Sequence, residues 1–129
     1  MTKKHCIEQV PGGPPAIGPY SPVVVAEGRL ALISGQIPFN PQSGKIERGS
    51  ITEQTRQVLQ NLQRAVEAAG AALDQVVSCR VYLQSLTPET FAEMNAVYAE
   101  FFGDSKPARA TVGAQLLGFD VEIEAIVVF

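Results

Sequence analysis

Arg109 places a cation in an otherwise apolar stretch of small residues near the C-terminus. It is the only charged residue between Lys106 and Asp120. A guanidinium keeps its proton in proteins, so it needs an anionic partner wherever it is partly buried. Its planar fork matches a carboxylate. Two interpretations follow: Arg109 binds the carboxylate of a small acid, or it forms a structural ion pair with one of the 13 acidic residues of the chain.

Two glutamates near the C-terminus have the chemistry of a general base or acid. Glu122 and Glu124 share one face of an expected strand, because side chains alternate along a strand. A carboxylate with a raised pKa can exchange protons with a substrate near neutral pH. The alternative is that both glutamates are solvated at the outer end of the strand. Arg109 and Thr111 share one face of the preceding strand, but the register between the two strands cannot be deduced from the sequence.

Four further residues are candidates to line a site. Tyr20 ends a proline-rich loop, where a half-buried ring with a solvated hydroxyl is its ordinary role. Ser34 and Gly35 follow a hydrophobic strand, and the glycine either lets a ligand approach the backbone or marks a β-bulge. Asn95 falls on the apolar stripe of an expected helix, where its amide must find partners in a nearby loop or a pocket.

Patterns for metal binding, nucleophilic catalysis and phosphate binding are absent from the sequence. His5 is the only histidine, and no Cys-x-x-Cys pair exists, so neither a zinc site nor a catalytic triad is expected. Residues 12–15 place prolines where a phosphate loop needs free amides. Cys6 and Cys79 are expected to be free thiols. We therefore predict no metal and no cofactor.

Composition and charge limit the class of protein. With 129 residues, 46% hydrophobic and 18% charged, the chain is expected to form one domain over residues 1–129. A net charge of -3 gives no basic surface for nucleic acid. No apolar run approaches the ~20 residues of a membrane span. The N-terminus lacks the apolar core of a signal peptide, so the predicted location is the cytoplasm.

Hydrophobic periodicity predicts the elements that must position these residues. One helix begins after Ser50, which forms a capping box with Glu53, and ends at Gly70. A second has Thr87 as its N-cap and ends at Gly103. Strands are expected over residues 5–10, 23–26, 30–35, 76–83, 108–114 and 120–129.

The order β-β-β-α-β-α-β-β predicts a two-layer α+β domain with about six strands and both helices on one sheet face. Residues 23–26 and 30–35 are interpreted as a hairpin, and residues 108–114 and 120–128 as a pair joined by a short loop. The strands carry apolar residues on both sides, and the chain offers no third layer. We therefore expect another subunit to cover the second face.

Four blocks of sequence resemble the RidA (YjgF-like) family of enamine/imine deaminases: residues 16–21, 33–38, 107–110 and 121–126. Residues 66–70 and 95–102 match as well, so the resemblance covers nearly the whole chain. It implies a chorismate-mutase-like α+β fold with a mixed sheet. It also implies a homotrimer with three sites in the clefts between subunits.

The resemblance also implies an activity, the hydrolysis of 2-imino acids such as 2-iminopropionate and 2-iminobutyrate to 2-keto acids and ammonia, without a cofactor. Arg109 would hold the substrate carboxylate, and Glu122 would position or activate the water. The backbone carbonyl of Thr111 would accept a hydrogen bond from the imine nitrogen. The other residues that the resemblance places at the pocket are Tyr20, Ser34, Gly35 and Asn95.

Some family members carry cysteine at the position of Thr111, which leaves the substrate range open. The presence of Arg109 argues against the family branches that lack this arginine. Alternatives are a regulatory trimer that binds 2-keto acids without turnover, and a deaminase dedicated to one pathway, such as aminoacrylate removal in pyrimidine breakdown. A ribonuclease or translation inhibitor is disfavoured by the acidic charge and the single histidine. Binding needs only Arg109, whereas hydrolysis should also need Glu122.

Overall fold

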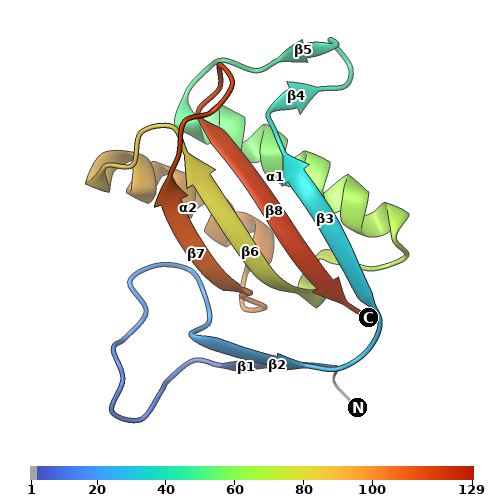
Figure 1. Ribbon diagram of the computed structural model, residues 1–129, viewed down its shortest axis with the longest axis vertical. Helices are drawn as coiled ribbons and strands as arrows, with labels where there is room; N and C mark the ends of the chain where they lie inside the picture. The colour runs from blue at the N-terminus through green and yellow to red at the C-terminus, as the bar shows by residue number, and fades with distance from the viewer. Residues whose placement is uncertain (1–2) are drawn as a thin grey trace.

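The computed structural model describes residues 3–129 (Figure 1). Its helices are α1 (Ile51–Ala68), the short 3-10 helix η1 (Leu73–Gln75) and α2 (Pro88–Phe102). Its strands are β1 (Lys4–Ile7), β2 (Val23–Ala26), β3 (Leu30–Gln36), β4 (Phe39–Asn40), β5 (Lys45–Ile46), β6 (Val76–Leu83), β7 (Ala108–Gly113) and β8 (Val121–Val128).

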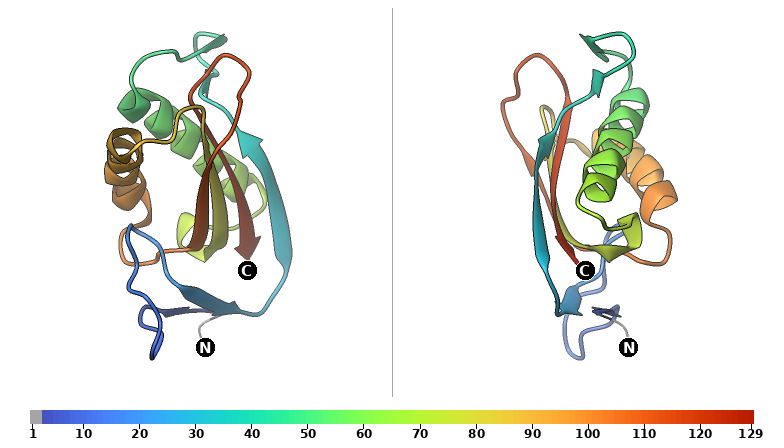
Figure 2. Two further views of the ribbon diagram at one scale, coloured as in Figure 1. Left: turned by 60° about the vertical axis from the view of Figure 1, so that its left-hand side comes forward. Right: turned by 90° about the vertical axis from the view of Figure 1, so that its right-hand side faces the viewer.

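The central sheet has the strand order β3-β8-β6-β7. β6 and β7 run parallel, and the other two pairs are antiparallel, so the sheet is mixed. Both long helices cover the same face of this sheet, as the side view in Figure 2 shows. The predicted two-layer α+β architecture with both helices on one face is confirmed.

Local signals position the two helices as predicted. The side chain of Ser50 caps α1 by accepting a hydrogen bond from the amide of Glu53 at 3.1 Å. Thr87 caps α2 in the same way through the amide of Thr90, and Gly103 ends the helix with a φ of 54°. The carboxylate of Glu93 on α2 accepts hydrogen bonds from the amide and hydroxyl of Thr52, both at 2.9 Å. This contact fixes the two helices relative to each other.

The predicted hairpin of residues 23–26 and 30–35 is wrong. β2 pairs with β1 in a separate two-stranded ribbon, and β3 pairs with β8. Glu27 extends the ribbon by donating its amide to Lys3, whereas Arg29 exchanges backbone hydrogen bonds with Phe129 in the central sheet. Gly28 is the corner between them, with a φ of 141° that other residues rarely adopt. The six long strands are therefore divided between a ribbon and a four-stranded sheet.

The predicted pairing of residues 108–114 with 120–128 is also wrong, because β6 lies between β7 and β8. α2 carries the chain back along the sheet, so that β7 enters parallel to β6. β8 buries an apolar residue at every second position and takes a central place. β7, which carries Arg109, stays at the edge, where a charged side chain can reach the surface.

The sheet face opposite the helices exposes large apolar side chains. Leu30 and Leu32 on β3 are 68% and 75% exposed, although they lie on a regular strand. Exposed apolar surface of this kind marks an interaction site more often than a free surface. The second subunit that the sequence predicts for this face remains a prediction.

Candidate functional site

The side chain of Arg109 lies on the helix side of the edge strand β7, beside Cys79 of β6. Three aromatic rings surround its guanidinium carbon. The ring centroids of Tyr20, Phe91 and Tyr98 lie 5.4, 5.6 and 4.8 Å from this carbon. Rings at these distances attract a cation with their faces, so they hold the guanidinium without neutralising it.

No acidic side chain pairs with Arg109 anywhere in residues 3–129. The two ion pairs of this part of the chain join Arg56 to Glu100 and Arg80 to Glu124. The Nη1 atom of Arg109 is buried without a hydrogen-bond partner. Burial lowers the pKa of Arg109, but an arginine side chain still keeps its proton at neutral pH. Within one chain the structural ion-pair interpretation is therefore wrong, and the arrangement fits an anion supplied from outside the chain.

Other polar atoms on this side of the sheet are also buried without partners. Near Arg109 they are Asn95 Oδ1 and Thr111 Oγ1, and the hydroxyl of Tyr98 has only the thiol of Cys79 as a weak partner. An unpaired buried polar group costs about 1–3 kcal/mol, so several on one side of a sheet call for an explanation. Arg109 and Thr111 share a face as predicted, and Asn95 points into this region from α2. A polar ligand at the Arg109 guanidinium would find these groups close by.

The loop of residues 11–22 closes over Arg109 through Gly18 and Tyr20. A Cβ atom on Gly18 would lie 3.0 Å from Nη2 of Arg109 and 3.3 Å from Nδ2 of Asn95. A larger residue at this position would therefore push the loop away from the guanidinium. The sequence pattern indicates Tyr20 and Asn95 as site residues, but not Gly18, Phe91 or Tyr98. The two aromatic residues belong to the apolar stripe of α2, and the stripe itself gives no sign that these two rings face a cation.

Glu122 lies on the opposite face of the sheet. Its side chain covers Gly35, where a Cβ atom would collide with the carboxylate. The pairing of β3 with β8 slips between Ile33 and Gln36, so Gly35 is at once a bulge and a point of close approach. Ser34 in the same bulge is exposed. The β-bulge interpretation of Gly35 is therefore confirmed, whereas the approach of a ligand to its backbone stays a prediction.

Glu124 is engaged in a structural contact, whereas Glu122 is not. Tyr82 donates its hydroxyl to Glu124 at 2.6 Å, and Arg80 lies 3.5 Å from the same oxygen. The hydrogen bond to Glu124 raises the pKa of Tyr82. Among the hydrogen bonds of residues 3–129, none involves the carboxylate of Glu122. Of the two glutamates, Glu122 is the one left available for chemistry.

The predicted site residues thus form two groups on opposite faces of one sheet. The first group lies around β7 and α2, and the second lies at the bulge between β3 and β8. Because β3 and β7 are the two edge strands of the sheet, the groups are also separated across its width. One chain cannot bring these groups around one small molecule. The first group is Tyr20, Asn95, Arg109 and Thr111, and the second is Ser34, Gly35 and Glu122.

Cys79 lies beneath Arg109 and is 1% exposed, and burial raises the pKa of its thiol to about 12. Since the thiolate is the reactive form, only about one molecule in 10⁴ carries it at pH 8. We expect a disulfide reagent at pH 8 to modify the half-buried Cys6 of the native protein and to reach Cys79 only after unfolding. The amount of thiolate that the reagent releases, measured with and without guanidinium chloride, tests this. Rapid reaction of two cysteines in the native protein would contradict it.

The same pKa shift predicts how stability depends on pH. An unfolded cysteine ionises near pH 9.0, whereas the folded thiol stays neutral until about pH 12. The unfolded state therefore loses its proton first, and the contribution of Cys79 to stability, which is complete below pH 9, falls above it. In Cys79→Ala the fall in the unfolding midpoint above pH 9 should be smaller than in the wild type.

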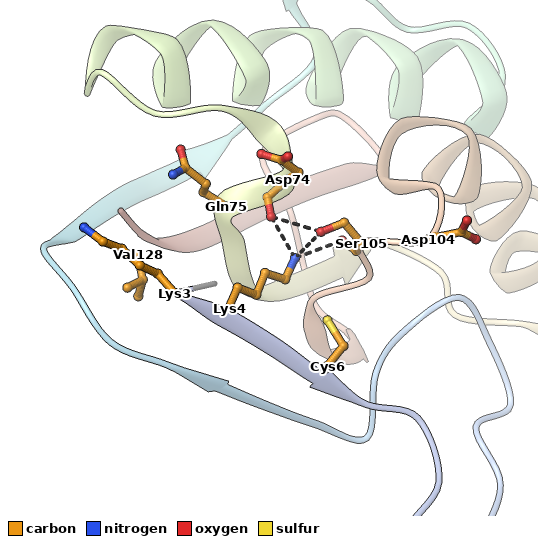
Figure 3. Close-up of a pocket in the computed structure, with 8 residues that line it drawn as sticks. All are labelled: Lys3, Lys4, Cys6, Asp74, Gln75, Asp104, Ser105 and Val128. Carbon is orange, nitrogen blue, oxygen red and sulfur yellow. Dashed lines mark hydrogen bonds between the residues drawn. The ribbon is translucent and has the colours of Figure 1, made fainter. Parts of the chain in front are cut away.

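A cavity of about 640 Å³ lies apart from both groups, between β1, η1 and the end of α2 (Figure 3). Lys4 crosses it and donates to the carbonyls of Asp74 and Ser105 at 3.2 and 2.9 Å, and to the hydroxyl of Ser105 at 2.9 Å. Burial lowers the pKa of Lys4. The Lys4 ammonium already donates to three acceptors of the same chain, so its contacts attach β1 to η1 and to the residues after α2. Residues 3–129 also contain no cluster of potential metal ligands.

Comparison with known proteins gives consistent matches over nearly the whole chain. The family described as Endoribonuclease L-PSP matches residues 12–129. A RutC family protein from Pyrococcus horikoshii is 50% identical over 115 residues, which cover 88% of this chain and 89% of that protein. No helix among the described residues has the length and apolar character to cross a membrane.

Solved structures give the same result. The crystal structure of RidA from an Antarctic Psychrobacter is similar with a TM-score of 0.73 and 35% identity, covering 97% of this chain and 100% of that one. A protein of unknown function from the Rid family of Yersinia pestis, YyfB, reaches a TM-score of 0.87 at 28% identity, covering 99% and 100%. The two-layer fold is therefore shared along the full length of these proteins.

Proposed function

Because this chain belongs to the Endoribonuclease L-PSP family, which includes the RutC and Rid proteins, we propose that it hydrolyses 2-imino acids to 2-keto acids and ammonia. The observation that carries the proposal is Arg109, a half-buried guanidinium held by three rings with no acid of the described chain beside it. A small carboxylate complements it in charge and shape. 2-Iminopropionate and 2-iminobutyrate are the substrates we expect.

The reaction needs few groups. The carbon of a protonated imine is already electrophilic, so a held carboxylate, a water molecule and a base are sufficient. Glu122 accepts a proton from the water as its oxygen bonds to the imine carbon. Glu122 returns this proton to the nitrogen of the resulting carbinolamine. The carbon–nitrogen bond then breaks as the hydroxyl gives its proton to Glu122, so that the keto group forms and ammonia leaves, taking that proton as ammonium. Arg109 fixes the carboxylate, and the backbone carbonyl of Thr111, on an edge strand, holds the imine nitrogen.

The separation of the two residue groups supports a site shared between two copies of the chain. In the proposed homotrimer, Arg109 and Thr111 of one subunit face the partner subunit's Glu122 and Gly35. The exposed Leu30 and Leu32 lie on the same strand as Gly35, which supports burial of this strand against a neighbour. Tyr20 and Asn95 would then close the pocket around the substrate, and Ser34 would line it from the partner's side.

The family description raises a ribonuclease as a second candidate. The charge of this chain does not favour it, since a net charge of -3 lacks the basic surface that binds RNA. His5, on β1, is the only histidine, so the chain has no histidine pair for RNA cleavage. A trimer that binds 2-keto acids without turnover remains the closer alternative, because it would use the same Arg109.

A coupled assay tests the proposal. A threonine dehydratase generates 2-iminobutyrate while semicarbazide traps the imine that escapes hydrolysis. We expect the wild-type protein to suppress semicarbazone formation and to speed the appearance of 2-ketobutyrate. No suppression, together with 2-ketobutyrate binding that depends on Arg109, would identify a binding trimer instead. Cleavage of RNA by the same preparation would support the second candidate.

A further inference from the structure

Ser21 fastens the loop of residues 11–22 to the rest of the protein. This loop contains five prolines, which have no amide to donate. Among its hydrogen bonds, the two that reach beyond residues 10–22 both come from Ser21. Its hydroxyl donates to the carbonyl of Lys106 at 2.6 Å, and its amide donates to the carbonyl of Pro107 at 3.0 Å. Ser21 is 2% exposed, so water does not compete for these bonds.

The residues just before Ser21 form one wall of the Arg109 site. Tyr20 places its ring over the guanidinium, and Gly18 brings the backbone against Nη2. The Tyr20 hydroxyl accepts a hydrogen bond from the amide of Ile17 at 3.1 Å, and the Tyr20 amide donates to the carbonyl of Gly18 at 2.9 Å. Residues 17–20 therefore hold together as a unit, whose position is fixed where Ser21 is attached.

The attachment point lies on the same stretch of chain as Arg109. Lys106 and Pro107 immediately precede β7, so Ser21 binds the wall to the strand that carries the guanidinium. The ribbon of β1 and β2 has separate attachments to this stretch. The thiol of Cys6 donates to the Lys106 carbonyl at 3.4 Å, and Lys4 bonds to Ser105 (Figure 3). Loss of the Ser21 hydroxyl removes the shorter of the two attachments, so it should loosen the loop and leave the ribbon in place.

We propose that Ser21 is a positioning residue for the Arg109 site, holding the wall of residues 17–20 against the guanidinium through the carbonyls of Lys106 and Pro107. The inference rests on the proposed function of Arg109 as the carboxylate-binding group. Ser21 touches no reacting atom. It acts by keeping the binding pocket formed before the substrate arrives, which favours binding more than the chemical step.

Ser21→Ala tests this, with Ser50→Ala as the control. The control removes the N-cap of α1, so it lowers stability without touching the loop. In Ser21→Ala we expect KM for 2-iminobutyrate to rise about 10-fold, while kcat changes less than about 2-fold. Amide exchange at Ile17 and Tyr20, whose amides are hydrogen-bonded within the loop, should quicken about 10-fold, whereas β1 and β2 should keep their protection. Ser50→Ala should change neither KM nor the exchange of the loop.

The exchange measurement separates failure of this inference from failure of the proposed function. If the wild type shows no turnover, the deaminase proposal fails. Exchange in the loop and the affinity for 2-ketobutyrate then still decide the role of Ser21. Unchanged exchange and unchanged affinity or KM in Ser21→Ala would overturn the inference. Exchange that rises equally in the loop, the ribbon and the sheet would also overturn it, because it would show only a loss of global stability.

Discussion

Replacing Arg109 with alanine should lower kcat/KM for 2-iminobutyrate about 10³-fold, because a bidentate pair of charge-assisted hydrogen bonds to the carboxylate is lost. Arg109→Lys keeps the charge but loses the planar fork and the contact with the three rings, so we expect a loss of about 10²-fold. The semicarbazone assay over a range of imine concentrations measures both. Arg56→Ala is the matched control, since Arg56 forms a surface ion pair with Glu100 on the helix layer.

The stability of Arg109→Ala distinguishes a binding group from a structural one. Removing one member of a buried structural ion pair strongly destabilises a protein. Arg109 has no such partner in residues 3–129, and its burial is unfavourable for the charge. The melting temperature of Arg109→Ala should therefore equal that of the wild type or exceed it. A large fall in melting temperature that parallels the loss of activity would contradict the proposed role.

Replacing Glu122 with glutamine should lower kcat about 10²- to 10⁴-fold, because the water loses the group that accepts its proton. Binding of 2-ketobutyrate should persist, since Arg109 is intact. Glu124→Gln on the same strand is the control: its carboxylate is held by Tyr82 and Arg80, and its loss should leave kcat within about 2-fold. Full activity of Glu122→Gln would exclude this residue from the reaction.

A mixture of the two inactive variants tests the shared site directly. When Arg109→Ala and Glu122→Gln subunits are unfolded together and reassembled, some sites combine the intact Arg109 of one subunit with the partner subunit's Glu122. With random assembly in a cyclic trimer, about a quarter of the sites should regain activity. Each variant reassembled alone should stay inactive. No recovery in a mixture that has demonstrably exchanged subunits would contradict a site built from two chains.

The elements of the fold that depend on local sequence could be predicted, and those that depend on long-range pairing could not. The caps at Ser50 and Thr87 are set by side chains within a few residues, so both helix starts were correct. The turn at Glu27-Gly28-Arg29 has the composition of a hairpin, yet it is a corner between two sheets. The strand with which each segment pairs is decided by residues far away in the sequence, such as Phe129. The local sequence pattern contains no information about them.

The candidate site shows the same division. Alternation along a strand correctly grouped Arg109 with Thr111, but it could not show that Glu122 points to the other face. Buried polar residues were also missed. Gln54 is 1% exposed and holds Asp120 through hydrogen bonds at 2.7 and 2.8 Å, which fixes the turn into β8. A glutamine on a helix usually faces solvent, so only the tertiary structure reveals this role.

The rings around Arg109, and the lack of an acid paired with it among residues 3–129, have a consequence for how the reaction would proceed as product accumulates. The 2-keto acid carries the same carboxylate as the imine, so the guanidinium attracts both equally. Such uniform binding lowers KM but does not speed the chemical step. We therefore expect the 2-keto acid product to inhibit competitively by binding to Arg109, and other small monocarboxylates to compete for the same guanidinium. In this scheme, sustained clearance of imines depends on a reaction that consumes 2-keto acids.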